Sequence, residues 1–418
     1  MPVITPQDDI NLTDSHYFAI HDIHHLFRRM RVADPVHWTQ GQLKRGFWSI
    51  FKHEDACTIY RGASEYFGNG NGIGLPSSPE VEAALTPESK GDHRSLIASD
   101  GELHRDFRKA FNGMFLPRAI KQYEHIGRKL VREILEEVLP RGHCEFATEV
   151  AARLPMAIIC EMMAIPRTDW QLIFDYVSQA MGPEDPEYHG KSTAVETRNQ
   201  AWREIVSYCI KLALERRGGS GADLLSIIAN SRVLGGRLLT DEELGYNGLM
   251  FLVGGLDTTR NATAGGLLEL IRNPDQMRRL HEDRRLLPTA VEETLRWTSA
   301  ITHSMRTALK DIEIRGKRIR KGDWVVVWNA SANRDDEVFA NPDKFNVARD
   351  PNDHLAFAYG EHFCLGAHLA RLEIRLIFEQ IVDHIPDVEL DGEVEWLASN
   401  LLHGVKRMPI KFTPLRRS

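Results

Sequence analysis

Apolar residues recur at spacings of three and four along most of the chain after about residue 101, a pattern typical of helices that bury one face. The pattern covers residues 107–115, 126–139, 154–165, 203–217 and 221–230. Strand-like runs occur early, at 36–40 and 46–52, and again late, between 313 and 335. We therefore predict a mainly α protein with a small β-sheet subdomain, closed into one domain over residues 1–418.

The most sharply bounded element is a predicted helix between Thr240 and Asn273. Thr240 and Glu243 have the spacing of a capping box, and the pair Asn273-Pro274 provides a stop. As a continuous helix, its roughly 30 residues would span about 45 Å. Its middle, LMFLVGGLDTTRNATAGGLLELI, is apolar on nearly every side, which is expected of a helix that crosses the protein core.

Gly254, Gly255 and Asp257 lie inside this apolar stretch, followed by Thr258 and Thr259. A glycine costs about 1 kcal/mol inside a helix, and a buried carboxylate costs more unless it has a partner. Two interpretations are open. The helix opens locally at a functional site, or the glycines permit a close helix–helix crossing.

The composition narrows the classes of function. The net charge of −7 over 418 residues gives no sign of a nucleic-acid partner. The five cysteines are odd in number and form no CxxC pair, which argues against a disulfide framework or a zinc knuckle and favours a reducing compartment. The N-terminus does not resemble a signal peptide, and the longest apolar run is too short to span a bilayer. We expect a cytoplasmic protein without a membrane anchor.

One cysteine, Cys364, lies in FAYGEHFCLG (357–366), directly before the helical pattern AHLARLEIRLIFEQIV. A buried structural thiol is one interpretation, and a metal-ligating thiolate is the other. A cysteine just before a helix faces unpaired backbone N–H groups and the positive end of the helix dipole. Both are expected to lower the pKa of its thiol.

Three motifs occur in an order that is similar to one known family. GGLDTT (254–259) resembles the oxygen-activation motif of a long central helix. Glu293-Thr-Leu-Arg296 resembles the ExxR motif, and residues 357–366 resemble the haem-ligand signature FxxGxxxCxG. The chain therefore resembles a cytochrome P450 over nearly its whole length. The resemblance implies a triangular helical haem domain, and it favours the ligand interpretation of Cys364 over the structural one.

The resemblance implies a haem b cofactor (iron protoporphyrin IX) with Cys364 as the iron ligand. Phe357 would pack under the sulfur, Gly360 would permit a tight turn, and Gly366 would avoid crowding the porphyrin. Gly254 would face the haem from the central helix. The residues implied to bind the haem propionates are His104, Arg108, Arg306 and His362.

The implied activity is the insertion of one oxygen atom of O2 into a hydrophobic small molecule. By resemblance, Thr258 would hydrogen-bond the distal oxygen or an ordered water, and Asp257 would gate protons from solvent. Three alternatives are a peroxide-dependent peroxygenase, a non-catalytic haem gas-binding protein, and an oxidase that captures carrier-bound intermediates. Glu293, Arg296 and Arg349 would form a buried ion-paired cluster with a structural role.

Electrons are expected from separate partners, by resemblance a ferredoxin and its NAD(P)H-dependent reductase, because the haem domain takes up the chain and leaves no reductase segment. A basic patch on the cysteine side would complement an acidic ferredoxin, although an ordinary solvated helix face explains the same charges. The candidate residues are Arg105, Lys109, Arg118, Lys121, Arg371 and Arg375.

The substrate is expected to be hydrophobic, such as a terpenoid, a steroid, an aromatic compound, a fatty acyl compound or a natural-product intermediate. By family analogy the pocket walls would include Met250, Val253, Ile301, Thr302, Leu401 and Leu402, all of which also fit plain core positions. Two segments rich in Gly, Pro and charge, 68–92 and 181–192, have the composition of mobile lids.

Overall fold

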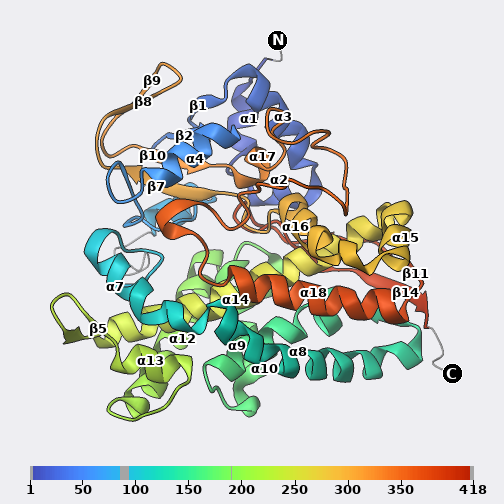
Figure 1. Cartoon of the computed structure of the whole chain (residues 1–418). Coiled ribbons are helices and arrows are strands. Elements are labelled where there is room, and N and C mark those ends of the chain that lie inside the picture. The colour runs from blue at the N-terminus through green and yellow to red at the C-terminus, as the bar shows by residue number, and fades with distance from the viewer. Residues whose placement is uncertain (1–2, 85–93, 190, 415–418) are drawn as a thin grey trace.

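The five-stranded main sheet and the main body of helices occupy separate parts of the protein (Figure 1). The computed structural model describes residues 3–84, 94–189 and 191–414. The α-helices are α1 (Pro6–Asn11), α2 (Ser15–Ile20), α3 (Ile23–Ala33), α4 (His53–Arg61), α5 (Pro79–Ala83), α7 (Gly101–Phe111), α8 (Pro117–Val138), α9 (Arg153–Met162), α10 (Trp170–Met181), α11 (Pro186–His189), α12 (Ala194–Arg216), α13 (Leu224–Asn230), α14 (Asp241–Arg272), α15 (Pro274–Glu282), α16 (Leu287–Thr298), α17 (Asn329–Ala332) and α18 (Ala367–His384).

The strands are short, and most come from the two ends of the chain, as the sequence predicts. Three of them, at 143–145, 232–233 and 237–238, lie in the middle, where only helices were expected. They are β1 (Val36–Thr39), β2 (Phe47–Ile50), β3 (Phe67–Gly68), β4 (His143–Glu145), β5 (Arg232–Val233), β6 (Arg237–Leu238), β7 (Ser304–Ala308), β8 (Ile312–Ile314), β9 (Lys317–Ile319), β10 (Trp324–Val327), β11 (Asp387–Leu390), β12 (Glu395–Trp396), β13 (Val405–Arg407) and β14 (Pro409–Thr413).

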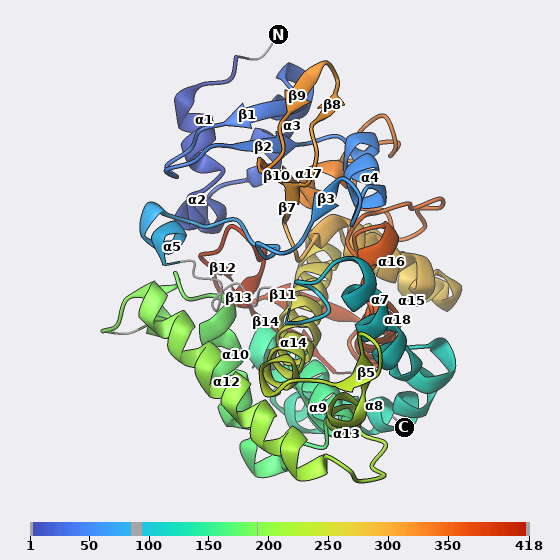
Figure 2. The same ribbon diagram turned by 90° about the vertical axis from the view of Figure 1, so that its left-hand side faces the viewer.

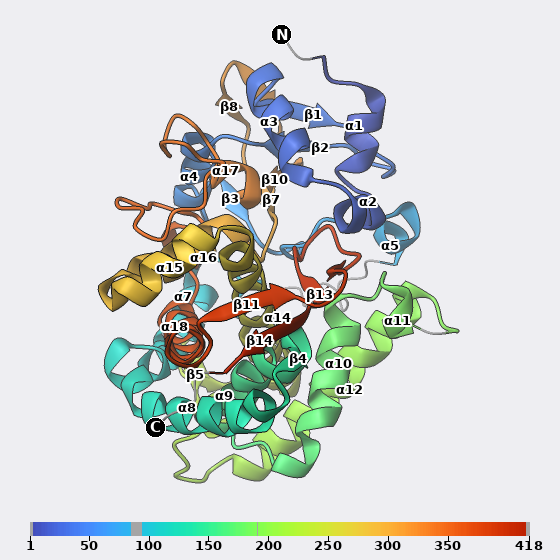
Figure 3. The same ribbon diagram turned by 90° about the vertical axis from the view of Figure 1, so that its right-hand side faces the viewer.

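The main sheet has the strand order β1-β2-β10-β7-β3. β10 pairs with β2 in parallel and with β7 in the antiparallel sense, so late strands extend an early hairpin. A second sheet, β11-β14-β4, lies next to α14 and α18 (Figure 3). Every residue of β10 is buried, which is why its sequence, WVVV, is apolar throughout.

The bounds predicted for the long central helix are confirmed, since α14 runs from Asp241 to Arg272 between the caps Thr240 and Asn273. The Thr240 side chain accepts a hydrogen bond from the backbone N–H of Glu243, and the Glu243 carboxylate accepts one from the Thr240 N–H. α14 packs against α9, α10, α12, α16 and α18. Within the described part of the chain, no helix is long and apolar enough to cross a bilayer.

Candidate active site

The loop that carries Cys364 is held by the backbone. The Cys364 N–H donates to the Phe357 carbonyl at 2.9 Å, and α18 begins three residues after the cysteine. Gly360 has a φ of 74°, and a Cβ at this position would lie 2.8 Å from the Tyr60 carbonyl oxygen. Only glycine fits that close approach, as the tight turn predicted at Gly360 requires. A Cβ on Gly366 would lie 4.0 Å from the Cys364 Sγ.

Residue Cys364 is exposed, although neighbouring residues partly desolvate its thiol. Burial raises the pKa of the thiol, whereas the Gly366 N–H, Arg108 and Arg371 lower it, and the net direction is upward. The backbone N–H at the start of the helix lowers this pKa, as expected, but desolvation outweighs it and the nearby cations, so the expected net decrease is not found. Binding of a metal ion would have to drive the deprotonation.

Gly254 is exposed in the middle of a helix whose other residues are mostly buried. A Cβ there would meet no atom within 4 Å, whereas a Cβ on Gly255 would lie 3.1 Å from Ile159 of α9. The helix-crossing interpretation therefore fits Gly255, and Gly254 borders open space instead. The predicted local opening is absent, because α14 is helical from Asp241 to Arg272.

Thr258 lies one turn after Gly254, on the same face of α14. Its hydroxyl donates to the Gly254 carbonyl oxygen at 2.8 Å, which satisfies the polar side chain without opening the helix. The lone pairs of Oγ1 are left to accept a hydrogen bond from a group in the open space.

Asp257 is buried and has a partner that the sequence analysis did not assign. Its Oδ1 lies 3.3 Å from the Nη1 of Arg260, which is buried as well. Burial lowers the pKa of Arg260, but Asp257 and then Tyr188 of α11 raise it, so the net direction is upward. The spacing of three residues on one helix is the signal that could have identified this pair.

His104 of α7 and His362 of the cysteine loop lie with their ring centroids 4.1 Å apart. Among the described residues, neither ring nitrogen of the buried His104 has a hydrogen-bond partner, and its Nδ1 lies 3.4 Å from a carboxylate oxygen of Glu361. The His362 Nε2 lies 3.4 Å from Asp100. Burial lowers the pKa of both histidines, that of His104 to about 4, so both rings are neutral at physiological pH.

Arg306 is a buried arginine without a carboxylate partner among the described residues. Its side chain donates one hydrogen bond, from Nη1 to the Met305 carbonyl at 2.8 Å, and its Nε has no partner. Arg108, one turn after His104 on α7, donates to the Glu361 carbonyl at 3.3 Å. A buried cation with unused donors is costly unless a ligand supplies an acidic group.

These features fit a haem group. Cys364 offers a thiol, Gly254 leaves open space, and His104 and Arg306 hold buried nitrogen atoms without partners. Porphyrin propionates are acidic groups of the kind that such donors bind. The residues that would hold the haem are therefore Cys364 for the iron and His104, Arg108, Arg306 and His362 for the propionates.

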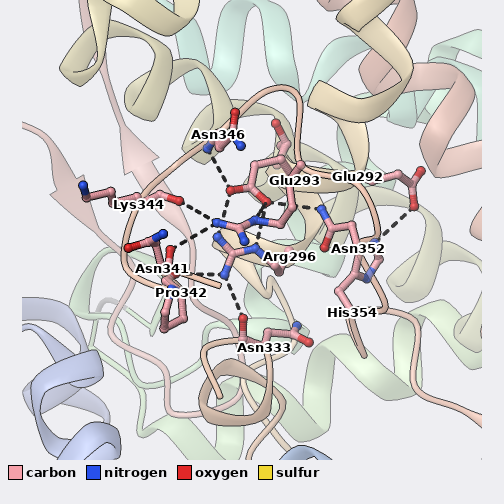
Figure 4. Close-up of polar contacts among 12 residues, drawn as sticks. Glu292, Glu293, Arg296, Asn333, Asn341, Pro342, Lys344, Asn346, Asn352 and His354 are labelled. Carbon is pink, nitrogen blue, oxygen red and sulfur yellow. Dashed lines mark hydrogen bonds and ion pairs between the residues drawn. The ribbon is translucent and has the colours of Figure 1, made fainter. Parts of the chain in front are cut away.

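Glu293 of α16 is completely buried between two arginines (Figure 4). Arg296 donates to both of its carboxylate oxygens at 2.8 Å, and the Arg349 Nε donates to one of them at 2.9 Å. The backbone N–H of Asn346 and the side chain of Asn352 donate to the same carboxylate. The remaining donors of the arginines bind the carbonyl oxygens of Asn333, Ala340, Asn341, Pro342 and Lys344.

The neighbouring Glu292 connects α16 to the cysteine loop. Arg371 of α18 donates to both of its carboxylate oxygens, at 2.7 and 2.8 Å, and stacks over the Phe357 ring at 4.7 Å. Burial raises the pKa of Glu292, but His354 and Arg371 lower it to about 2. Arg371 is thus engaged inside the protein, as is Arg375, which pairs with Glu124 and Glu379, and neither is a free member of the predicted basic patch.

The predicted pocket-wall residues fall into two groups. Ile301 and Leu402 pair in a β-bridge, and the Thr302 N–H donates to the Leu401 carbonyl at 2.8 Å. Thr302 and Leu402 are fully buried, which agrees with the plain-core interpretation for these two. The half-buried residues, which can still reach a ligand, are Met250, Val253, Ile301 and Leu401.

The two predicted lids contact each other and the β12–β13 region (Figure 2). The Ser77 hydroxyl donates to Glu184 at 2.6 Å, and Asp185 pairs with Lys406 of β13 at 3.1 Å. Both lids are thus held by polar contacts. Residues 85–92 of the first lid and residue 190 of the second lie outside the described residues.

Several known proteins are similar to this chain in sequence and in fold. The family model described as Cytochrome P450 matches residues 76–393. Cytochrome P450 NovI of Streptomyces niveus is 35% identical and the match covers 99% of each chain. The Steroid C26-monooxygenase of Mycolicibacterium smegmatis is 33% identical, over 92% of this chain and 89% of that one. A solved cytochrome P450 of Mycobacterium marinum in complex with pseudoionone has a TM-score of 0.88 at 30% identity, over 96% of this chain and 98% of that one. The chain belongs to the cytochrome P450 family and is a haem-dependent monooxygenase.

Proposed function

We propose that this cytochrome P450 uses haem b to insert one oxygen atom of O2 into a hydrophobic small molecule, with electrons from a ferredoxin and its NAD(P)H-dependent reductase. The observation that carries the proposal is the accessible Cys364 thiol together with the unpaired donors of His104 and Arg306. We further infer that residues 1–418 form one haem domain. The cytoplasmic location expected from the sequence stays a prediction.

When bound, the haem supplies the O2-activating chemistry, and thiolate ligation favours O–O bond cleavage. Thr258 accepts a hydrogen bond at Oγ1 and holds a water beside Gly254, since its own proton is donated to the Gly254 carbonyl. Asp257 carries protons toward this water. To do so, its carboxylate has to leave Arg260, which makes Arg260 the residue that positions Asp257 in its resting state.

The substrate is proposed to be a steroid or terpenoid-like molecule. One relative is named as a steroid monooxygenase, and one similar solved structure contains pseudoionone. The half-buried Met250, Val253, Ile301 and Leu401 supply apolar contacts for such a molecule. Product analysis after incubation of the reconstituted enzyme with steroids and terpenoids tests this proposal, and turnover of polar compounds alone would overturn it.

Replacing Thr258 with alanine is expected to lower product formed per NADH consumed about tenfold and to release peroxide instead, because the water beside Gly254 loses its acceptor. The measurement is NADH, product and peroxide in one reconstituted reaction. Thr263→Ala is the matched control, since Thr263 makes the same hydroxyl-to-carbonyl bond to Thr259 but is fully buried. Unchanged coupling in Thr258→Ala would count against the role of Thr258.

The same assay separates the alternative functions. Product formed with peroxide in the absence of reductant would favour a peroxygenase. Binding of O2 with no NADH consumption in the presence of redox partners would favour a gas-binding protein. Affinity for a loaded carrier domain, with none for the free compound, would favour a carrier-bound substrate.

Four basic residues of α7 and the first turns of α8 support docking of an acidic ferredoxin. Arg105, Lys109, Arg118 and Lys121 are exposed and form no ion pair within the described residues. Arg105 and Lys109 line a groove of about 200 Å³ together with His104 and Arg108. Positive charge beside the proposed propionate site is suited to steering an acidic partner toward the haem edge.

The double variant Arg105→Glu/Lys109→Glu is expected to lower the rate of reduction by ferredoxin roughly tenfold at low salt, with a smaller effect at high salt. Stopped-flow reduction at several ionic strengths measures this. The control is Lys411→Glu, which changes an exposed lysine of β14, a strand on the opposite side of the protein from α7 in Figure 1. An equal loss in both variants would refute the proposed docking surface.

A further inference from the structure

A cavity of about 410 Å³ lies between the α2–α3 junction, the second half of α14, the end of α16 and β12. α2 lies beside β12 (Figure 2), and both elements supply residues to the lining of the cavity. Its lining residues do not include any residue that we assign to the haem, the substrate or the ferredoxin. Its volume is in the range of small-molecule sites, far above the space of a single water.

Arg334 is the buried cation of this cavity. It is 6% exposed, and its side chain makes no hydrogen bond to any described residue. The nearest carboxylate oxygen, of Asp343, lies 3.6 Å from its Nη1, and its guanidinium stacks over Trp297 at 3.8 Å. By contrast, Arg296 uses both of its Nη atoms and its Nε in hydrogen bonds. Arg334 thus has unused donors next to empty space.

Two other buried side-chain atoms around the cavity have no partner among the described residues. Asn261 Nδ2 can only donate, whereas His24 Nδ1 donates or accepts according to its tautomer. The two lining carboxylates are already engaged. Asp22 accepts from the His24 backbone N–H at 2.9 Å, and Glu269 pairs with Arg272 at 3.0 Å. The missing partner is therefore a hydrogen-bond acceptor, and next to Arg334 an anionic acceptor is favoured.

Several of the side chains that line the cavity carry planar rings. Trp396 and His403 are stacked with their ring centroids 4.6 Å apart and their planes 22° apart. Trp297, covered by the guanidinium of Arg334, and Phe18 contribute further aromatic surface. Planar walls of this kind favour a planar ring over a branched aliphatic group.

We propose that this cavity is a second ligand site, which binds a small aromatic carboxylic acid with its carboxylate at Arg334 and its ring against Trp396 and His403. The acid reaches the site independently of the haem, so the proposal stands or falls separately from the proposed function. A chain of ordered waters is the competing occupant.

Calorimetric titration of the haem-loaded protein with 2-naphthoate tests the proposal, with 2-naphthamide as the uncharged analogue and acetate as the analogue without a ring. We expect one site for 2-naphthoate with at least about tenfold weaker binding of both analogues. The optical spectrum of the haem, recorded in the same titration, is expected to stay unchanged. Equal affinity for the amide, or no heat at millimolar 2-naphthoate, would overturn the proposal.

Three variants locate the site. Arg334→Gln is expected to weaken 2-naphthoate binding about tenfold, because it removes the charge that pairs with the carboxylate. Asp22→Asn is expected to strengthen it several-fold, since a carboxylate is removed from the cavity while asparagine keeps the N-cap of α3. Arg45→Gln, which removes an exposed arginine stacked on Trp324, is expected to change nothing. If Arg334→Gln does not fold, the Asp22→Asn variant tests the proposal by itself. Stronger binding of 2-naphthoate would support the site, and unchanged or weaker binding would overturn it.

Discussion

Replacing Cys364 with alanine is expected to abolish the long-wavelength absorption band of the reduced, carbon-monoxide-treated protein and to lower product formation more than about a hundredfold. The reason is that no other described cysteine can replace Cys364 as the iron ligand. Cys364 is exposed, whereas the other four are buried, namely Cys57, Cys144, Cys160 and Cys209. Burial raises the pKa of Cys144, Cys160 and Cys209 to about 12, which keeps these thiols protonated.

Haem binding and thiolate ligation are separable in this experiment. His104, Arg108 and Arg306 remain in Cys364→Ala, so some haem is expected to bind without the thiolate band. Cys57→Ala is the control, since Cys57 lies against His53 of α4 at 3.7 Å and outside the proposed site. A variant Cys364→Ala that keeps either the band or full activity would refute the assignment of the iron ligand.

The central helix shows how far local sequence signals reach. The capping box at Thr240 and Glu243 and the stop at Asn273-Pro274 are local, and α14 has the bounds that they predict. The role of each glycine is not local. Gly254 and Gly255 are adjacent in sequence, yet one borders open space and the other lies against Ile159 of α9. Only the packing of α9 on α14 distinguishes them.

The candidate site shows the same limit for charges. The family resemblance implies one site for His104, Arg306 and Cys364. The structure places His104 3.4 Å from Glu361 and His362 3.4 Å from Asp100. The sequence could not predict the upward direction of the Cys364 pKa, because this shift depends on desolvation by the whole fold. From the sequence alone, Arg371 and Arg375 also fit surface charges, because their partners Glu292 and Glu124 lie far away in the sequence. Only Glu379, four residues after Arg375, is a local partner.

Glu373 of α18 is a further group that sequence reasoning missed. It is 2% exposed, and neither carboxylate oxygen has a hydrogen-bond partner in the described part of the protein. Burial raises the pKa of its carboxyl group well above the usual value. In the sequence it is one polar residue of an amphipathic helix, and only the neighbouring α14 makes it a core position.

Glu293→Ala is expected to lower the free energy of unfolding by about 3–5 kcal/mol and to yield little haem-loaded protein. The substitution removes the carboxylate that holds Arg296 and Arg349 and leaves two buried guanidinium groups without a counter-charge. Because Asn346 and Asn352 donate to the same carboxylate, the chain on both sides of Arg349 loses its anchor as well. Haem content per protein and the urea midpoint of unfolding measure the effect.

Glu124→Ala is the matched control, because Glu124 also lies between two arginines, Arg128 and Arg375, but is partly exposed. Removal of a solvated ion pair costs no more than about 1 kcal/mol, so this variant is expected to keep its haem. Burial of Glu293 is thus the variable that separates the two outcomes. Normal haem loading of Glu293→Ala, or an equal loss of stability in both variants, would show that the cluster does not support the cysteine side of the fold.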